Sequence, residues 1–360
     1  MEARVREILS EFEIPAGETE AGPFGGGHIN STYRVSIRTA EGEKLYILQR
    51  INSYVFKNPQ LVVDNIEKVT DYLREAIRRE GGDPARETLQ LIPSRNGGYM
   101  VRDAEDGCWR MYDFITHTVS KDLPDTPALF RLCGEAFGHF QKLLGGFPAD
   151  TLSESIPNFH NTPDRLRQLR EAVERNASGR RDDVLPEIAF CEARAAECSG
   201  LVDALARGEI PLRVTHNDTK LNNVLLDEKT GRGVCVIDLD TVMPGLAAYD
   251  FGDSIRTGAS TAAEDERDLS LVNFSLPMYR AFAQGFLSEV GSTLTRREIE
   301  LLPLGAKLMT LENGIRFLTD HLNGDLYFHI HREGQNLDRA RTQFRLVLCM
   351  EENWEAMKLT

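Results

Sequence analysis

Three oxygen-bearing side chains between residues 214 and 240 could together carry chemistry. Asp218 and Asn223 lie in a polar turn ahead of an apolar run, and Asp238 ends the next apolar run. A carboxylate can orient a hydroxyl group and accept its proton, whereas amide and carboxylate oxygens can hold Mg²⁺. Transfer of a phosphoryl group from ATP to a hydroxyl group needs both functions. The residue types therefore predict phosphoryl transfer.

The spacing of these residues matches the catalytic loop of protein kinases. That loop reads His-x-Asp-x-x-x-x-Asn, and His216, Asp218 and Asn223 match it position for position. Asp238 ends an apolar strand 20 residues after Asp218, where the metal-binding aspartate belongs. Asp and Asn are also common in ordinary turns, so these residue types alone would be weak evidence for a catalytic loop. The apolar strands on both sides of the motif make the match more specific. We expect Asp218 to be the catalytic base and Asn223 and Asp238 to bind Mg²⁺.

A second kinase-like motif follows the loop. Asp250-Phe251-Gly252 spells the kinase tripeptide, but it follows a Pro-Gly turn rather than a strand and lies 32 residues after Asp218. We therefore expect Asp250, together with His216, to brace the catalytic loop through hydrogen bonds.

The elements that must position these side chains form two lobes. Alternating apolar residues predict strands in the first part of the chain, at 31–38, 45–51, 88–92, 98–101 and 109–112, and Asn58-Pro59 opens a helix there. Helical spacing prevails from residue 127 onward, at 164–206, 264–290, 296–322 and 335–358, around one β segment at 211–240. This order predicts an α+β, bilobal, protein-kinase-like fold, with a β-rich nucleotide-binding lobe (1–112), a hinge (113–117) and a helical lobe (118–360).

The glycines Gly25, Gly26 and Gly27 form the first candidate nucleotide contact. Their backbone amides could approach phosphate groups, as in kinase glycine loops. An ordinary hairpin turn would have the same composition.

The second candidate contact is a cation on the third strand, where protein kinases carry a lysine. Here that strand ends in Gln49-Arg50. Alternation places Arg50 on the face of Leu48 and Gln49 on the other face. We expect Arg50 to hold the phosphates, with Gln49 as the alternative, and its acidic partner to be Asp64 or Glu67.

The segment that joins the lobes is the third candidate contact. Met111-Tyr112-Asp113-Phe114-Ile115 can offer backbone N–H and C=O groups to adenine, so Asp113 and Ile115 are the expected contacts. A simple linker would have the same sequence.

Composition limits the class of protein. The chain has 360 residues and a net charge of −14, with 41% apolar and 27% charged residues, which is typical of a globular protein. The net negative charge argues against nucleic acid as a partner. No apolar run is long enough to span a membrane. The predicted first helix contains acidic residues, which a signal peptide would lack. Six cysteines without a Cys-x-x-Cys pair fit a reducing cytoplasm.

At these motifs the chain resembles the aminoglycoside phosphotransferase and choline kinase-like superfamily, and within it the N-acetylhexosamine 1-kinases. The resemblance runs over essentially the whole chain. It is carried by Gly26-Gly27-His28-Ile29-Asn30, Tyr46-Ile47-Leu48-Gln49-Arg50-Ile51-Asn52, Phe159-His160-Asn161-Thr162-Pro163, Asp218-Thr219-Lys220-Leu221-Asn222-Asn223-Val224 and the long run from Asp238 to Asp253.

The resemblance implies phosphorylation of the anomeric (C1) hydroxyl group of N-acetylglucosamine or N-acetylgalactosamine, with ATP as co-substrate and Mg²⁺ as cofactor. It implies sugar contacts from Asp218, His28, Arg316 and Tyr327, the last two within the helical lobe. The expected partners of the protein are therefore ATP and a neutral amino sugar. We expect the protein to be a monomer or a weak homodimer. Where the family loop reads His-Gly-Asp, this chain has Asn217, the side chain that best tolerates a positive φ.

Two other functions remain open. The acceptor could be another hexose, an aminoglycoside, choline or homoserine, although a choline pocket needs an aromatic cage and the chain has only two Trp residues. A regulatory pseudokinase that binds nucleotide is the alternative of another class, but such proteins typically lose one of the three residues that are present here.

Overall fold

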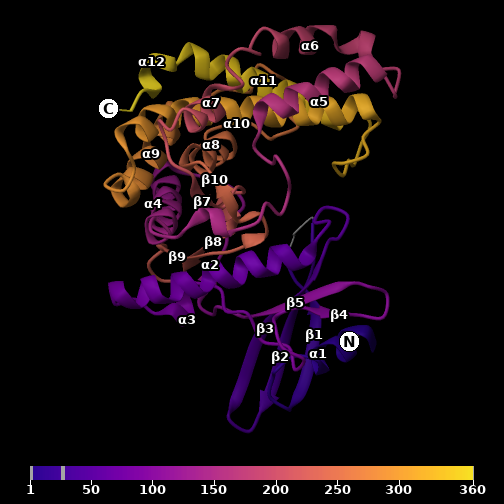
Figure 1. The fold of residues 1–360 in the computed structure, drawn as a ribbon, viewed down its shortest axis with the longest axis vertical. Helices are drawn as coiled ribbons and strands as arrows, with labels where there is room; N and C mark the ends of the chain where they lie inside the picture. Colours follow the sequence, from indigo (N-terminus) through magenta and orange to yellow (C-terminus); the bar gives the residue numbers. More distant parts are fainter. Residues whose placement is uncertain (1–2, 26–28, 360) are drawn as a thin grey trace. The chain divides into compact units, whose positions relative to one another are not determined.

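The computed structural model describes residues 3–25 and 29–359, and they form an α+β architecture (Figure 1). The chain divides into two compact units. The first unit comprises Met1–Val119, Gly146–Pro157 and Leu225–Pro244, and the second comprises Ser120–Gly145, Asn158–Val224 and Gly245–Thr360. The first unit thus takes in two segments that lie beyond residue 118, because the chain returns to it twice. Within the described residues, no helix combines the length and the apolar character that a membrane span requires.

The first unit is built on a five-stranded antiparallel sheet in the order β1-β2-β3-β5-β4. Its strands are β1 (Glu18–Pro23), β2 (Ser31–Thr39), β3 (Gly42–Ile51), β4 (Val101–Arg102) and β5 (Cys108–Asp113). The same unit contains α1 (Ala3–Ser10), α2 (Pro59–Glu80), α3 (Pro84–Glu87), β6 (Thr118–Val119), η1 (Ala149–Thr151), β9 (Gly233–Val236) and η4 (Leu239–Thr241). Strand β8 (Val224–Asp227) pairs with β6. Strand β10 (Met243–Gly245) lies where the last segment of the first unit ends.

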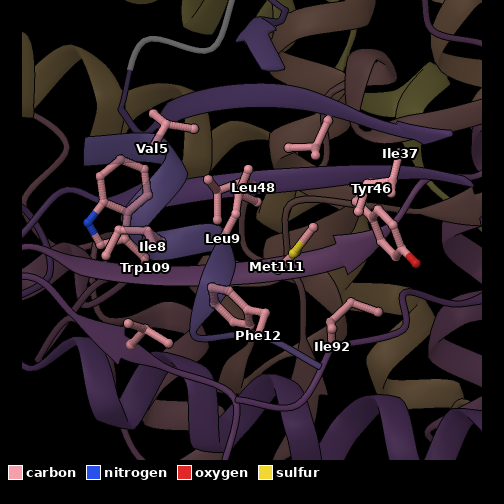
Figure 2. Packing of buried hydrophobic residues seen from close by; sticks show 12 residues of the cluster. Val5, Ile8, Leu9, Phe12, Ile37, Tyr46, Leu48, Ile92, Trp109 and Met111 are labelled. Carbon is pink, nitrogen blue, oxygen red and sulfur yellow. The ribbon is translucent and has the colours of Figure 1, made fainter. Parts of the chain in front are cut away.

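One face of this sheet is an apolar core that α1 covers (Figure 2). Val5 and Phe12 pack there against Leu48 of β3 and Met111 of β5, and all four are almost fully buried. Side chains alternate along a strand, so Arg50 shares the face of Leu48, whereas Gln49 points to the opposite face. The alternation predicted from the sequence thus separates the two candidate phosphate-binding residues.

The second unit is mostly helical. It contains α4 (Pro127–Leu143), α5 (Thr162–Arg175), η2 (Arg181–Val184), α6 (Leu185–Glu192), α7 (Gly200–Ala206), β7 (Arg213–Thr215), η3 (Leu221–Asn223), α8 (Ala247–Gly258), α9 (Leu276–Val290), α10 (Arg296–Asn323), α11 (Gln335–Glu352) and α12 (Trp354–Met357). The long helix α10 packs against α5, α8 and α11 (Figure 1). A capping box, in which Thr295 and Glu298 satisfy each other's backbone N–H groups, fixes where α10 begins.

Helices α8 and α10 approach each other unusually closely. A Cβ atom on Gly252 of α8 would lie 2.4 Å from the carbonyl oxygen of Gly305, and one on Gly305 would lie 2.3 Å from that of Ala248. Only glycine allows two helix backbones to come this near. The contact joins the helix that carries Asp250 to the helix that carries Arg316.

Several details differ from the sequence prediction. The strand predicted at 98–101 is reduced to β4 at Val101–Arg102. Helix α8 lies between residues 241 and 263, where the sequence predicts no helix, and Pro244-Gly245 belong to β10. The helix predicted over 264–290 begins only at Leu276. The strand predicted at 88–92 is reduced to one bridge between Leu91 and Tyr112.

Candidate active site

The catalytic loop follows β7 and is anchored by a buried carboxylate. Asp250 accepts hydrogen bonds from the backbone N–H groups of His216 (3.0 Å) and Asn217 (2.8 Å) and from the side-chain amide of Gln141 (2.7 Å). Burial raises the pKa of Asp250, and these donors and His216 offset part of that effect. Asn217 has φ 66°, in the left-handed region that asparagine tolerates.

The next residue of the loop is also held by α8. The backbone N–H of Thr219 donates to Asp253 (2.8 Å), and its hydroxyl group donates to the carbonyl oxygen of Asp250 (2.6 Å). The hydroxyl group of Ser254 donates to the carbonyl oxygen of Thr219 (2.7 Å). The backbone on both sides of Asp218 is therefore fixed, which leaves the Asp218 side chain as the part of the loop that can act on a substrate.

Asp218 stands between a cation and an amide. Lys220 Nζ lies 2.8 Å from its Oδ1, and Asn223 Nδ2 donates to its Oδ2 (3.2 Å) and to its carbonyl oxygen (2.8 Å). Burial acts to raise the pKa of Asp218, but the charge and hydrogen bond of Lys220, with His216 and Arg256, outweigh it and lower the pKa. The side chain is 27% exposed, so a charged carboxylate is presented to solvent and to ligands.

The Asn223 side chain fits the role of a metal ligand. Its amide nitrogen is committed to Asp218, which turns the amide oxygen away from that residue. An amide oxygen is a ligand that Mg²⁺ accepts. The donor set of the loop thus suits a divalent cation, which would offset the charge of bound phosphate groups.

Replacing Lys220 by Met should move the acid limb of the activity profile to higher pH. Lys220 favours the charged form of Asp218, so without it burial dominates and the pKa of Asp218 rises. The fraction of ionised base then falls at a pH where the native enzyme is still fully ionised. The check is kcat/KM measured from about pH 4 to about pH 9, a range that brackets the ordinary carboxylate pKa. Lys220→Arg keeps the charge and should keep the native limb; an unshifted limb in Lys220→Met would contradict the coupling.

The segment that carries Asp238 belongs to the first unit. Asp238 adopts the left-handed conformation with φ 60° and opens the turn η4. Two residues on, the buried Asp240 forms an ion pair with Arg110 of β5 and accepts a hydrogen bond from Asn30 Nδ2 (2.7 Å). Gln49 Oε1 accepts from Arg110 Nε (3.1 Å) and Nη2 (2.9 Å). Gln49, rather than Arg50, therefore shares a network with the segment 238–240.

The remaining nucleotide candidates have varied surroundings. Gly25 has φ 76°, whereas Gly26, Gly27 and His28 lie outside the described residues. Asp64 accepts a hydrogen bond from Gln60 (2.6 Å). Burial raises the pKa of Glu67, with help from Asp71 and Asp64. In the connecting segment Asp113 is exposed and Ile115 is buried.

Two of the four expected sugar contacts, Arg316 and Tyr327, lie in and just after the last turns of α10. The guanidinium of Arg316 stacks between the rings of Phe159 (5.2 Å) and Phe328 (5.4 Å). Tyr327 is exposed, and its backbone N–H donates to the buried carboxylate of Asp320 (2.8 Å). Asp320 also accepts from the N–H groups of the residues on either side, so one carboxylate fixes the short segment that presents Tyr327.

A buried histidine links this end of α10 to the catalytic loop. His160 Nδ1 lies 2.9 Å from Glu312 Oε1, and its Nε2 lies 3.4 Å from the carbonyl oxygen of Asn217. Thr162 donates to the other oxygen of Glu312 (2.7 Å). Burial acts to raise the pKa of Glu312, but His160 and two arginines outweigh it and lower the pKa. His160 thus connects α10 to the residue that precedes Asp218.

Sequence reasoning missed Lys220, Arg110 and Glu312 as site residues. Lys220 lies inside the loop motif, so its position beside Asp218 was a readable signal. Arg110 is a charged residue within the apolar run of β5, an unusual placement that calls for a partner. Glu312 lies in the interior of a helix and carries no local signal.

The sequence profile of the phosphotransferase enzyme family (APH) matches residues 20–284. The solved structure of a microcompartment-associated aminopropanol kinase is similar to this chain, with a TM-score of 0.60 at 15% identity over 99% of this chain and 98% of that one.

Two further solved structures share the fold. Choline kinase from Cryptosporidium parvum Iowa II has a TM-score of 0.59 at 14% identity, over 97% of this chain and 96% of its own. Spectinomycin phosphotransferase in complex with ADP and spectinomycin has a TM-score of 0.58 at 13% identity, over 98% and 97%. These likenesses confirm the α+β kinase-like fold, and with the family match over most of its length the chain belongs to the phosphotransferase enzyme family.

Proposed function

We propose that the protein is an ATP-dependent kinase that phosphorylates the anomeric hydroxyl group of N-acetylhexosamines to give N-acetylhexosamine 1-phosphate. The observation that carries the phosphoryl-transfer part is the arrangement of Asp218, Lys220 and Asn223 on a loop fixed by Asp250. The choice of acceptor rests on the family resemblance of the sequence.

Asp218 orients the acceptor hydroxyl group and takes its proton as the new O–P bond forms and the bond to ADP breaks. A carboxylate of low pKa suffices for this role. In a loose transition state the acceptor hydroxyl group loses its proton late, so the orientation of that group matters more than the basicity of Asp218. Asn223 and Asp238 are the proposed ligands of Mg²⁺, which when bound offsets charge on the phosphate groups.

The surroundings of Arg316 and Tyr327 suit a neutral acceptor. Burial and the charge of Arg316 lower the pKa of Arg165, whereas Glu312 opposes that shift. Hydroxyl and acetamido groups can accept hydrogen bonds from guanidinium groups. This is consistent with an N-acetylhexosamine acceptor.

An acceptor panel tests the proposal. ADP release is measured with N-acetylglucosamine, N-acetylgalactosamine, glucose, an aminoglycoside, choline and homoserine, and the product is analysed by phosphorus NMR for coupling to the anomeric proton. The proposal expects turnover with at least one N-acetylhexosamine and an anomeric phosphate. Phosphate on another hydroxyl group, or turnover with choline alone, would reject the acceptor assignment. ATP binding without transfer to any acceptor would favour a pseudokinase.

Asp320→Asn should weaken acceptor binding more than turnover. An amide cannot accept all the N–H groups that surround the carboxylate, so the segment that presents Tyr327 loosens. We expect KM for the sugar to rise about tenfold, the equivalent of one lost hydrogen bond of about 1.4 kcal/mol, with KM for ATP unchanged. Asp182→Asn, at an exposed carboxylate, is the matched control. An unchanged sugar KM would remove Tyr327 from the acceptor site.

A further inference from the structure

Arg110 is a buried arginine on the polar face of the β-sheet. It lies on β5 opposite Gln49 of β3, and only 1% of its surface is exposed. Its Nε and Nη2 donate to Gln49 Oε1, and Nη2 also pairs with Asp240 Oδ1. Burying a guanidinium this completely is costly unless its partners compensate for the lost water.

The compensation is incomplete. Arg110 Nη1 and the hydroxyl group of Tyr112, two residues further along the same face of β5, are buried with no hydrogen-bond partner among the described residues, and Asp240 Oδ1 has only its ion pair with Arg110. The Arg110 guanidinium lies 5.3 Å from the Tyr112 ring. Buried groups with a purely structural role are normally satisfied. An unsatisfied pair beside an acidic segment indicates that this cation serves something besides packing.

Arg110 is the centre of a chain of contacts that reaches the segment 238–240. Asp240 receives Arg110 on one oxygen and Asn30 Nδ2 on the other, and its carbonyl oxygen accepts from the hydroxyl group of Ser155 (3.2 Å). Asn30 Oδ1 in turn accepts from the backbone N–H of Asn52 (3.0 Å). One ion pair and two hydrogen bonds thus hold Asp240 to other parts of the first unit.

Asp238 depends on this anchor for its conformation. A non-glycine residue in the left-handed region is strained and persists only where its surroundings hold it. The turn that begins at Asp238 includes Asp240, and the positive charge of Arg110 interacts with both carboxylates. Fixing Asp240 therefore limits how far the backbone of the turn that begins at Asp238 can move.

We propose that Arg110 is the positioning residue of the Asp238 metal ligand, acting through Asp240. Only 1% of the surface of Arg110 is exposed, so its role is to hold Asp240 rather than to contact the phosphate groups themselves. The proposal rests on the proposed function in one respect, the binding of a magnesium-nucleotide complex. It does not depend on which sugar is the acceptor.

The test measures how nucleotide binding depends on Mg²⁺. ADP binding to the full chain is followed by calorimetry at graded Mg²⁺ concentrations and in EDTA, for the native protein and for Arg110→Gln, Arg110→Lys and Arg50→Gln. Arg38→Gln, at an exposed arginine of the same sheet, is the control for loss of charge. We expect Arg110→Gln to raise the half-saturating Mg²⁺ concentration about tenfold or more, as for other partners of metal ligands. Metal-free ADP binding should be unchanged, and Arg110→Lys should lie in between.

Each outcome decides the assignment. An Mg²⁺ requirement in Arg110→Gln equal to the native one, or a larger rise in Arg50→Gln, would overturn the role of Arg110 while leaving the kinase proposal intact. Failure of the native protein to bind ADP at all would overturn both. If Arg110→Gln does not fold, the double variant Arg110→Gln with Asp240→Asn removes both charges of the buried pair. It should fold and still require more Mg²⁺; a native requirement there would reject the proposal.

Discussion

Asp218→Asn should lower kcat by about 10²- to 10⁴-fold, the usual contribution of a positioned general base. The amide has the shape of the carboxylate but cannot accept the proton of the acceptor hydroxyl group. Its neighbours stay in place, because Asp250 and Asp253 hold the backbone on both sides. Steady-state kinetics with the best acceptor of the panel measure the loss, and calorimetry with ADP checks that nucleotide binding survives.

The loss must be in turnover rather than in folding. Asp182→Asn removes an exposed carboxylate and should keep native kinetics. The thermal midpoint of Asp218→Asn should fall slightly, because the lowered pKa of Asp218 means that its charge stabilises the folded protein beside Lys220 and Arg256. The kinetics are therefore compared well below that midpoint. Turnover within a few-fold of the native enzyme would remove Asp218 from the role of base.

The catalytic loop could be predicted from the sequence because its information is local. The motif spans only eight positions, from His216 through Asp218 to Asn223. The positive φ of Asn217 could be expected because asparagine tolerates that conformation. Which of Gln49 and Arg50 faces the segment 238–240 could not be predicted in the same way. Alternation separates Gln49 from Arg50, but which face meets the segment 238–240 depends on contacts between residues more than a hundred positions apart.

Helix α8 shows why local propensity misled the prediction. Gly252 and Gly258 each cost about 1 kcal/mol relative to alanine in a helix, and the Pro-Gly pair before it suggested a turn. Packing decides the outcome, because both glycines are buried at contacts that admit no side chain, Gly252 against α10 and Gly258 against Phe130 of α4. The residue that braces the loop therefore stands in the first turn of a helix that the sequence does not reveal.

Replacing the bracing carboxylate, in Asp250→Asn, should lower both the free energy of unfolding and kcat. The carboxylate accepts three N–H groups on two oxygens, whereas an amide has one oxygen and turns its own N–H₂ toward at least one of those donors. A buried donor left unsatisfied costs about 1–3 kcal/mol. We expect that loss in the free energy of unfolding, measured by urea denaturation.

Turnover should fall further than stability alone explains. Asp250 holds the N–H groups of His216 and Asn217, so its loss lets the backbone that carries Asp218 shift, and a displacement of about 1 Å can cost about 10²-fold in rate. The assay is run well below the unfolding midpoint of the variant, where all of the protein is folded. Asp268→Asn, at an exposed carboxylate that binds only a nearby serine, is the matched control. A folded Asp250→Asn with native kcat would show that the loop keeps its geometry without this carboxylate, and the bracing role would then pass to Asp253 and Ser254.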